Sequence, residues 1–144
     1  MIRDVFDGLL FVGDALAARD RKQIYDHSLE AVLDLAANEP PAVLGRDIIY
    51  CRYPLTDDES NDDRILVLAI ECLESLLRNK YRTLVACGAG MSRSVVIAAS
   101  ALSIRTDVPL DLALKNVTMD APRDVSPGLF KSVIRVHKQI ANKI

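Results

Sequence analysis

Cys87 and Arg93 have the residue types and the spacing needed for chemistry on phosphate esters. Five residues separate them, and two of these, Gly88 and Gly90, allow a tight backbone turn. A short apolar run precedes this stretch and a longer one follows it, which predicts a loop between a strand and a helix. In such a loop the backbone N–H groups and the helix N-terminus form a concave anion site. Arg93 can hold two phosphate oxygens, and these positive groups favour the thiolate of Cys87, which is a nucleophile.

The sequence around these two residues resembles the signature of the cysteine-dependent phosphatases, H-C-x-x-G-x-x-R-[ST]. It reads Ala86-Cys87-Gly88-Ala89-Gly90-Met91-Ser92-Arg93-Ser94, and its C-x-A-G-x-S-R-S form is typical of the dual-specificity protein phosphatases. One position departs, because Ala86 stands where the family has a histidine that orients the loop and helps to keep the cysteine ionised. We therefore expect less thiolate at neutral pH and slower turnover, but an active enzyme.

Three further segments carry the resemblance across nearly the whole chain. Gly8–Gly13 resembles the family's first strand, G-L-[YF]-[LI]-G, and Tyr53–Asp57 resembles its [IV]-P-V-x-D segment. Arg123–Leu129 resembles the late loop R-x-x-x-P-x-x-G-F with a shorter spacing. The resemblance implies a single catalytic domain of the dual-specificity phosphatase type over residues 1–144.

The resemblance also implies a role for each residue of the site. Cys87 would attack phosphorus and form a cysteinyl-phosphate, and Arg93 would hold the equatorial oxygens in the transition state. Asp57 would protonate the leaving oxygen and then activate water, with Asp58 as the second candidate for this role. Ser94 would help the thiolate to leave in the second step. The substrate-binding cradle would be formed by Gly88, Ala89, Gly90, Met91, Ser92 and Arg93, in which Ser92 braces the loop.

Three functions can be considered for these residues. The first is a phosphatase acting on phosphorylated proteins or peptides, with phosphotyrosine as the main substrate and phosphoserine or phosphothreonine as further ones. The second is a phosphate-recognition module with weakened catalysis, which only Ala86 favours. The third is a sulfurtransferase or arsenate reductase, which fits neither the upstream acidic loop nor the G-x-S-R-S tail. Phosphoinositide substrates are disfavoured because Gly88–Ser92 contains no lysine for additional phosphates.

The elements that position these residues alternate between strands and helices. Strands are predicted at Leu9–Val12, Ala31–Leu35, Ile48–Tyr53 and Thr83–Ala86, with Pro54 ending the third. Brief helices are predicted after caps at Asp14 and Asp20, and longer ones at 65–76, 95–104, 109–119 and 130–140. We expect Ser60 or Asn61 to cap the helix at 65–76, with Asp62 and Asp63 in its first turn.

This alternation predicts an α/β fold with a mostly parallel central sheet of four to five strands, flanked by helices. The cysteine loop would then lie at the carboxyl edge of the sheet, where open α/β sheets bind ligands.

The composition is that of an ordinary globular chain of 144 residues, half of them hydrophobic and 26% charged. A net charge of −2 creates no strong field for nucleic acid or an anionic membrane. No signal peptide or membrane-spanning run is apparent. Three cysteines without metal-type spacing favour reduced thiols and a cytoplasmic location. We expect no metal and no other cofactor, because Arg93 and the loop amides supply the positive field.

Four other reactive residues have structural interpretations. Cys51 and Cys72 fall on apolar positions of a strand and a helix, so we expect both to pack in the core. His137 lies on the apolar stripe of the last helix, where a packed histidine is expected, and His27 is expected at a helix C-terminus or on the surface. The sequence does not indicate the oligomeric state.

Overall fold

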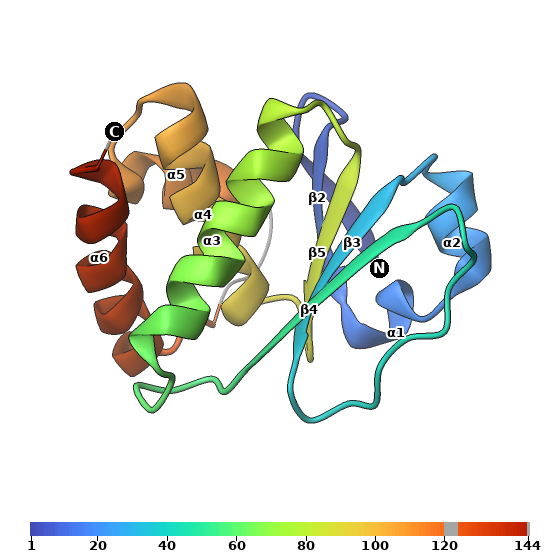
Figure 1. Ribbon diagram of the computed structural model, residues 1–144, viewed down its shortest axis with the longest axis horizontal. Helices are drawn as coiled ribbons and strands as arrows, with labels where there is room; N and C mark the ends of the chain where they lie inside the picture. The colour runs from blue at the N-terminus through green and yellow to red at the C-terminus, as the bar shows by residue number, and fades with distance from the viewer. Residues whose placement is uncertain (120–123, 144) are drawn as a thin grey trace.

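Figure 1 shows the computed structural model, which describes residues 1–119 and 124–143 as a central sheet with helices on both faces. The sheet has five strands in the order β1-β2-β5-β3-β4. They are β1 (Ile2–Phe6), β2 (Leu10–Asp14), β3 (Ala31–Ala36), β4 (Ile49–Leu55) and β5 (Thr83–Cys87). Strands β2, β5, β3 and β4 run parallel, and β1 pairs antiparallel with β2. The expected fold, a mostly parallel sheet of four to five strands, is therefore confirmed.

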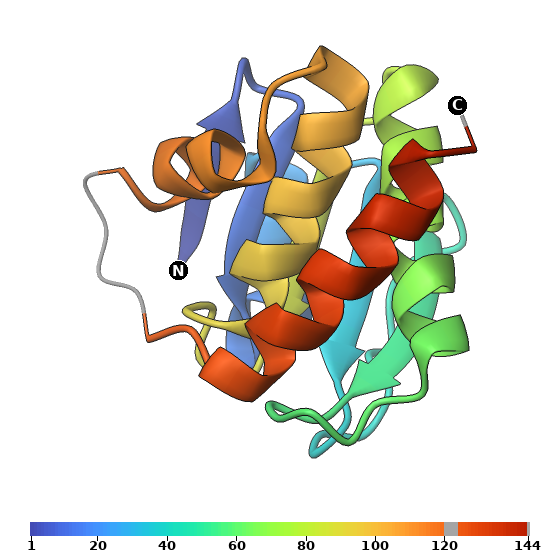
Figure 2. The same cartoon turned by 90° about the vertical axis from the view of Figure 1, so that its left-hand side faces the viewer.

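Six helices are described, in two layers. Helices α1 (Ala15–Ala18) and α2 (Arg21–Asp26) lie on one face of the sheet (Figure 1). The other face carries α3 (Asp63–Arg78), α4 (Arg93–Thr106), α5 (Leu110–Thr118) and α6 (Pro127–Ala141). Figure 2 shows α4 in the middle of this layer, and it contacts α3, α5 and α6. This central position explains why every residue from Ser94 to Ser103 is buried. Within the described residues, no helix combines the length and the apolar character that crossing a bilayer requires.

Strand β1 is an element that the sequence-based prediction misses. It is an edge strand with partial exposure along its length, and Arg3 and Asp4 interrupt its apolar pattern. The turn that follows it has a recognisable signal, because Asp7 and Gly8 both have positive φ, at 48° and 66°. An Asp-Gly pair in this conformation is typical of a tight β-hairpin.

Two expected boundaries around the acidic loop are wrong. Strand β4 does not end at Pro54 but continues to the fully buried Leu55. It is an edge strand, and proline is tolerated there because its missing N–H can face away from the sheet. The cap of α3 is Asp62, whose side chain accepts a hydrogen bond from the Arg64 N–H. Ser60 and Asn61 bond within the loop instead: Ser60 donates to Asp58, and the Asn61 side chain pairs with the backbone of Thr56.

Candidate active site

The cysteine loop joins the central strand of the sheet to the central helix. Cys87 is the last residue of β5 and is 2% exposed, and Arg93 is the first residue of α4. The loop turns at Gly90, which has φ +73°, and a Cβ there would lie 2.9 Å from the Gly13 carbonyl oxygen at the end of β2. Glycine is required at this position by both the backbone conformation and the close approach of the neighbouring strand.

A cavity of about 90 Å³ lies over this loop. Its described lining is formed by Asp57, Cys87, Ala89, Met91, Ser92, Arg93 and Asp124. At roughly 30 Å³ per water molecule, the cavity has room for a small oxyanion rather than for a whole substrate. The fold thus brings the expected nucleophile, guanidinium and carboxylate to one small space, although two elements, α3 and β5, separate Asp57 from the loop in the sequence.

Ser94 lies directly behind the cysteine. Its hydroxyl is 3.2 Å from Cys87 Sγ, and its side chain is fully buried in the first turn of α4. A hydroxyl at this distance can donate a hydrogen bond to a thiolate. The geometry required for the role that the resemblance implies for Ser94 is therefore present.

The Arg93 side chain reaches across the ends of the neighbouring strands. Its Nη1 donates to the Leu55 carbonyl over 2.8 Å and lies 3.4 Å from Asn38 Oδ1. A Cβ added to Gly88 would lie 2.8 Å from Arg93 Nη2, so the guanidinium packs closely against the Gly88 backbone. Among the described residues Nε and Nη2 have no hydrogen-bond acceptor, so they can donate to phosphate oxygens.

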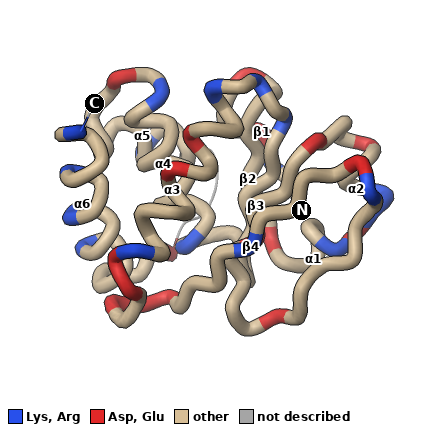
Figure 3. Tube along the Cα trace, in the orientation of Figure 1, with Lys and Arg blue, Asp and Glu red and all other residues tan. Residues whose placement is uncertain are grey.

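The two candidate acids lie in different environments. The loop between β4 and α3 carries several of the acidic residues that are drawn red in Figure 3. Asp57 lines the cavity, and its Oδ1 accepts a hydrogen bond from the Ser92 hydroxyl over 2.5 Å. Asp58 instead accepts bonds from Ser60 and Thr56 within its own loop. The bonds from Ser60, followed by that from Thr56, lower the pKa of Asp58, so that less of it carries a proton to donate at neutral pH.

Ser92 joins the acidic loop to the segment before α6. Besides donating to Asp57, its oxygen accepts a hydrogen bond from the Ser126 N–H over 2.9 Å. The same segment is bonded to the cysteine loop through the Asp124 N–H, which donates to the Met91 carbonyl over 3.1 Å. This arrangement agrees with the expectation that Ser92 braces the loop.

A buried ion cluster lies beside Ala86, the position of the family's histidine. Ala86 is fully buried, and its partner in the register of β3 and β5 is Asp34, which is also fully buried. Asp34 Oδ2 is 2.8 Å from the guanidinium nitrogens of both Arg19 and Arg52, and it accepts a bond from the Tyr50 hydroxyl over 2.5 Å. A buried carboxylate of this kind requires such partners.

The same two arginines hold the chain that follows β3. Arg52 donates to the Glu39 carbonyl over 2.6 Å, and Arg19 donates to the Pro40 carbonyl over 2.7 Å. Arg52 also donates to the Ala36 carbonyl over 3.1 Å, so Asn38, which approaches Arg93, lies between two residues that Arg52 holds. The cluster therefore holds the chain around Asn38 as well as the end of β3.

Sequence reasoning misses two residues of this site, Asn38 and Asp124. Asn38 follows β3, the neighbour of β5 in the sheet, so the parallel order of the strands is the signal that could have found it. Asp124 belongs to the late segment that resembles the family's loop, but that pattern does not single it out. Arg123, with which that segment begins, lies outside the described residues.

The other reactive side chains lie apart from the lining of the cavity. Cys51 and Cys72 are partly exposed and pack against the hydrophobic core between the sheet and helices α3, α4, α5 and α6, as expected. Burial, together with the neighbouring Cys51, raises the pKa of Cys72 to about 11, so its thiolate is scarce at neutral pH. His137 packs against Ser100, with 2.7 Å between Nδ1 and Oγ, and His27 is the C-cap residue of α2. Both histidines agree with their structural interpretations.

The sequence is similar to those of two curated phosphatases. It is 32% identical over 127 residues to "Dual specificity protein phosphatase Mpk3" of Drosophila melanogaster, over 87% of this chain and 31% of that protein. It is 31% identical over 128 residues to "Dual specificity protein phosphatase 13B" of Mus musculus, over 83% of this chain and 63% of that protein. The chain thus spans less than two thirds of the length of either relative. No family model matches it.

Solved structures of phosphatases share the fold. Human DUSP28 superposes with a TM-score of 0.84 over 100% of both chains, at 21% sequence identity. A mouse putative dual specificity phosphatase complexed with zinc tungstate gives 0.84 over 99% of this chain and 89% of that one, at 21% identity. DUSP15 gives 0.76 over 99% of this chain and 96% of that one, at 19% identity. These likenesses confirm the fold expected from the cysteine loop.

Proposed function

We propose that this chain, which belongs to the dual-specificity phosphatase family in sequence and in fold, hydrolyses phosphate monoesters on protein side chains. Phosphotyrosine is the main substrate in this proposal, with phosphoserine and phosphothreonine as further ones. The observation that carries it is the single cavity of about 90 Å³ lined by Cys87, Arg93 and Asp57. The residues between Cys87 and Arg93 add backbone donors for the phosphate oxygens.

In the first step the Cys87 thiolate attacks phosphorus. A sulfur–phosphorus bond forms while the bond from phosphorus to the ester oxygen breaks, and Asp57 gives its proton to the leaving oxygen. Arg93 and the amides of the loop hold the three equatorial oxygens, whose charge they stabilise in the transition state. The placement of Asp57 beside Ser92 supports its assignment as the acid over Asp58.

In the second step water attacks the cysteinyl-phosphate. Asp57, now a carboxylate, takes a proton from the water, and the sulfur–phosphorus bond breaks to release inorganic phosphate. Ser94 donates a hydrogen bond to the departing thiolate, a role supported by the 3.2 Å between its oxygen and Cys87 Sγ. Because Ala86 supplies no imidazole, turnover is slower than in relatives with the histidine.

The proposal extends to the organisation and location of the protein. The catalytic domain is proposed to span residues 1–144. This is supported by the superposition on DUSP28, which covers 100% of this chain. A cytoplasmic location is proposed because Cys51, Cys72 and Cys87 are all unpaired thiols, and Cys87 must stay reduced to react.

The test is steady-state hydrolysis of p-nitrophenyl phosphate at neutral pH. We expect turnover by the wild type, loss of at least a thousandfold in Cys87→Ser, and little change in the matched control Cys51→Ser. Equal rates in the wild type and Cys87→Ser would reject hydrolysis by this cysteine. If neither protein turns over but both bind inorganic phosphate, the chain is a recognition module rather than an enzyme.

A further inference from the structure

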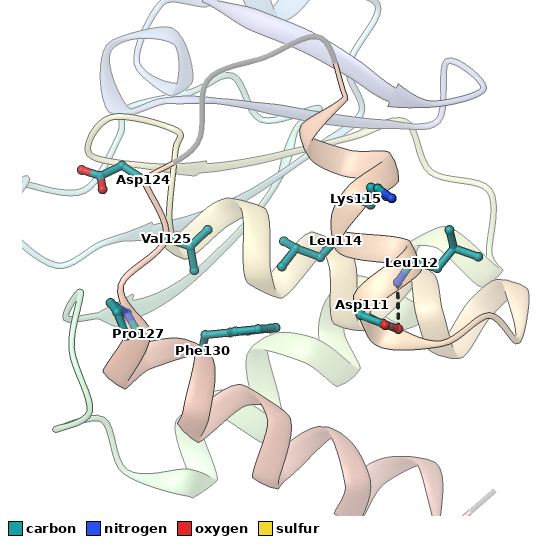
Figure 4. Close-up of a pocket in the computed structure, with 8 residues that line it drawn as sticks. All are labelled: Asp111, Leu112, Leu114, Lys115, Asp124, Val125, Pro127 and Phe130. Carbon is teal, nitrogen blue, oxygen red and sulfur yellow. Dashed lines mark hydrogen bonds between the residues drawn. The ribbon is translucent and has the colours of Figure 1, made fainter.

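A second, larger cavity lies beside the catalytic one. It has a volume of about 730 Å³ and is bounded by α5, the segment 124–127 and the start of α6 (Figure 4). This volume is within the range of roughly 300–1,000 Å³ that is usual for ligand pockets. Its described lining consists of Asp111, Leu112, Leu114, Lys115, Asp124, Val125, Pro127 and Phe130.

Five of the eight described residues that line this cavity are apolar. Figure 4 shows Val125 and Leu114 facing each other from opposite walls, with the Phe130 ring between α6 and α5 below them. Val125 and Phe130 are each only partly buried, so water meets apolar side chains here. The other three lining residues, Asp111, Lys115 and Asp124, are charged.

Asp124 connects the two cavities, because it lines both of them. In Figure 4 its carboxylate points away from Val125, on the other side of the chain. The Asp124 N–H donates a hydrogen bond to the Met91 carbonyl of the cysteine loop. This bond holds Asp124, which separates the two cavities, against the loop. Asp124 lines the smaller cavity, and the next residue, Val125, lines the larger one. Adjacent Cα atoms lie about 3.8 Å apart, so the two cavities are close neighbours along the chain.

We propose that this cavity binds an apolar side chain of the phosphorylated protein substrate, from a residue within three positions of the phosphorylated one. The proposal rests on the proposed function of the catalytic cavity. An extended peptide advances about 3.3–3.6 Å per residue, so three residues span about 10–11 Å, and the two cavities share a wall at Asp124. A leucine, isoleucine or phenylalanine matches the apolar part of the lining, whereas a charged side chain would lose its hydration against Leu114, Val125 and Phe130.

The experiment compares phosphotyrosine peptides that differ at one position. Leucine, serine or aspartate is placed in turn at each of the three positions on either side of the phosphotyrosine, and kcat/KM is measured. At one position or more we expect the leucine peptide to exceed the serine peptide by about tenfold, and the aspartate peptide to be the poorest. The same peptides, labelled with fluorescein, are also bound to Cys87→Ser protein, which gives a readout that does not depend on turnover.

Two variants test whether the preference comes from this cavity. Val125→Thr keeps the shape of the side chain but makes it polar, and Phe130→Ala removes the ring. In both we expect the ratio between the leucine and serine peptides to fall to about two or less. The ratio is taken within each protein, so a change in the amount of folded enzyme cancels. Leu68→Ser, at an exposed apolar residue of α3, is the matched control and should keep the wild-type ratio.

Each outcome separates this proposal from the proposed function. Hydrolysis of p-nitrophenyl phosphate with equal rates for leucine and serine peptides would overturn the apolar subsite and leave the phosphatase intact. If the preference for leucine over serine peptides survives in Val125→Thr and Phe130→Ala, the apolar subsite does not lie in this cavity. If the wild type is inactive but Cys87→Ser binds the leucine peptide about tenfold more tightly, the subsite stands while hydrolysis fails. No binding of any phosphopeptide would reject the subsite.

Discussion

The Ser92 hydroxyl donates a hydrogen bond to Asp57 Oδ1 over 2.5 Å, so the cysteine loop directly holds the carboxylate proposed as the general acid. Ser92 is 7% exposed, and its oxygen also accepts the Ser126 N–H. One buried hydroxyl thus joins the acidic loop, the cysteine loop and the start of α6. The position of Asp57 over the catalytic cavity depends on this contact.

Removal of that hydroxyl should reduce turnover. In Ser92→Ala we expect kcat for a phosphotyrosine peptide to fall about tenfold, equivalent to about 1.4 kcal/mol, because Asp57 loses the contact that positions it over the cavity. The measurement is steady-state kinetics of Ser92→Ala and of a control variant, Ser60→Ala. The control removes an exposed hydroxyl from the acidic loop. A loss as large in Ser60→Ala would mean that the order of the loop, rather than the Ser92 contact, is responsible.

The two neighbouring aspartates should differ in their importance. We expect Asp57→Asn to lower kcat for a phosphotyrosine peptide by about a hundredfold, since general acid catalysis contributes at least that much. The loss should be smaller for p-nitrophenyl phosphate, whose leaving group needs less protonation. Asp58→Asn should remain within about twofold, because Asp58 bonds within its own loop. The reverse order of the two variants would assign the acid to Asp58.

The buried Asp34 should be important for stability. Asp34→Asn leaves the guanidiniums of Arg19 and Arg52 without their carboxylate, so the free energy of unfolding should fall by about 3 kcal/mol in urea at neutral pH. The matched control is Asp26→Asn, which removes the partner of Lys22 in an exposed pair and should have no measurable effect. Equal stability of Asp34→Asn and the wild type would show that the cluster is not needed for folding.

His137 should make stability depend on pH. Burial lowers its pKa below the ordinary value of 6.5, so the unfolded chain binds a proton there more readily than the folded chain. This contribution is complete above pH about 6.5 and is lost as the pH falls below it. We therefore expect the free energy of unfolding to drop less between pH 7 and pH 5 in His137→Gln than in the wild type. The same drop in both proteins would contradict the assignment.

Elements with local signals can be predicted from the sequence. Strand β5, the cysteine loop and α4 form one continuous stretch, in which the glycines and the flanking apolar runs define each boundary within a few residues. The Asp14 cap of α1 and the Asp20 cap of α2 are also as expected. These features depend on residues no more than a few positions apart, so the chain itself carries the information.

Features that depend on the order of the strands are harder to predict. The continuation of β4 through Pro54 is tolerated only because β4 is an edge strand. The approach of Asn38 to Arg93 follows from the pairing of β3 with β5, and the contact of Asp124 with the cysteine loop follows from a bond to Met91. These last two contacts each join residues more than thirty positions apart. A single sequence has no periodic signal for contacts of that kind.

The central claim, that Cys87 carries the phosphoryl group, is tested most directly by trapping the intermediate. The protein is mixed with a ³²P-labelled phosphotyrosine peptide, quenched in acid within milliseconds to seconds, digested and sequenced by mass spectrometry. We predict label on the Cys87 peptide of the wild type and none in Cys87→Ser. At late quench times Asp57→Asn should keep more label than the wild type, because it lacks the base that hydrolyses the intermediate. Phosphate release without labelled Cys87, or label that persists in Cys87→Ser, would contradict the mechanism.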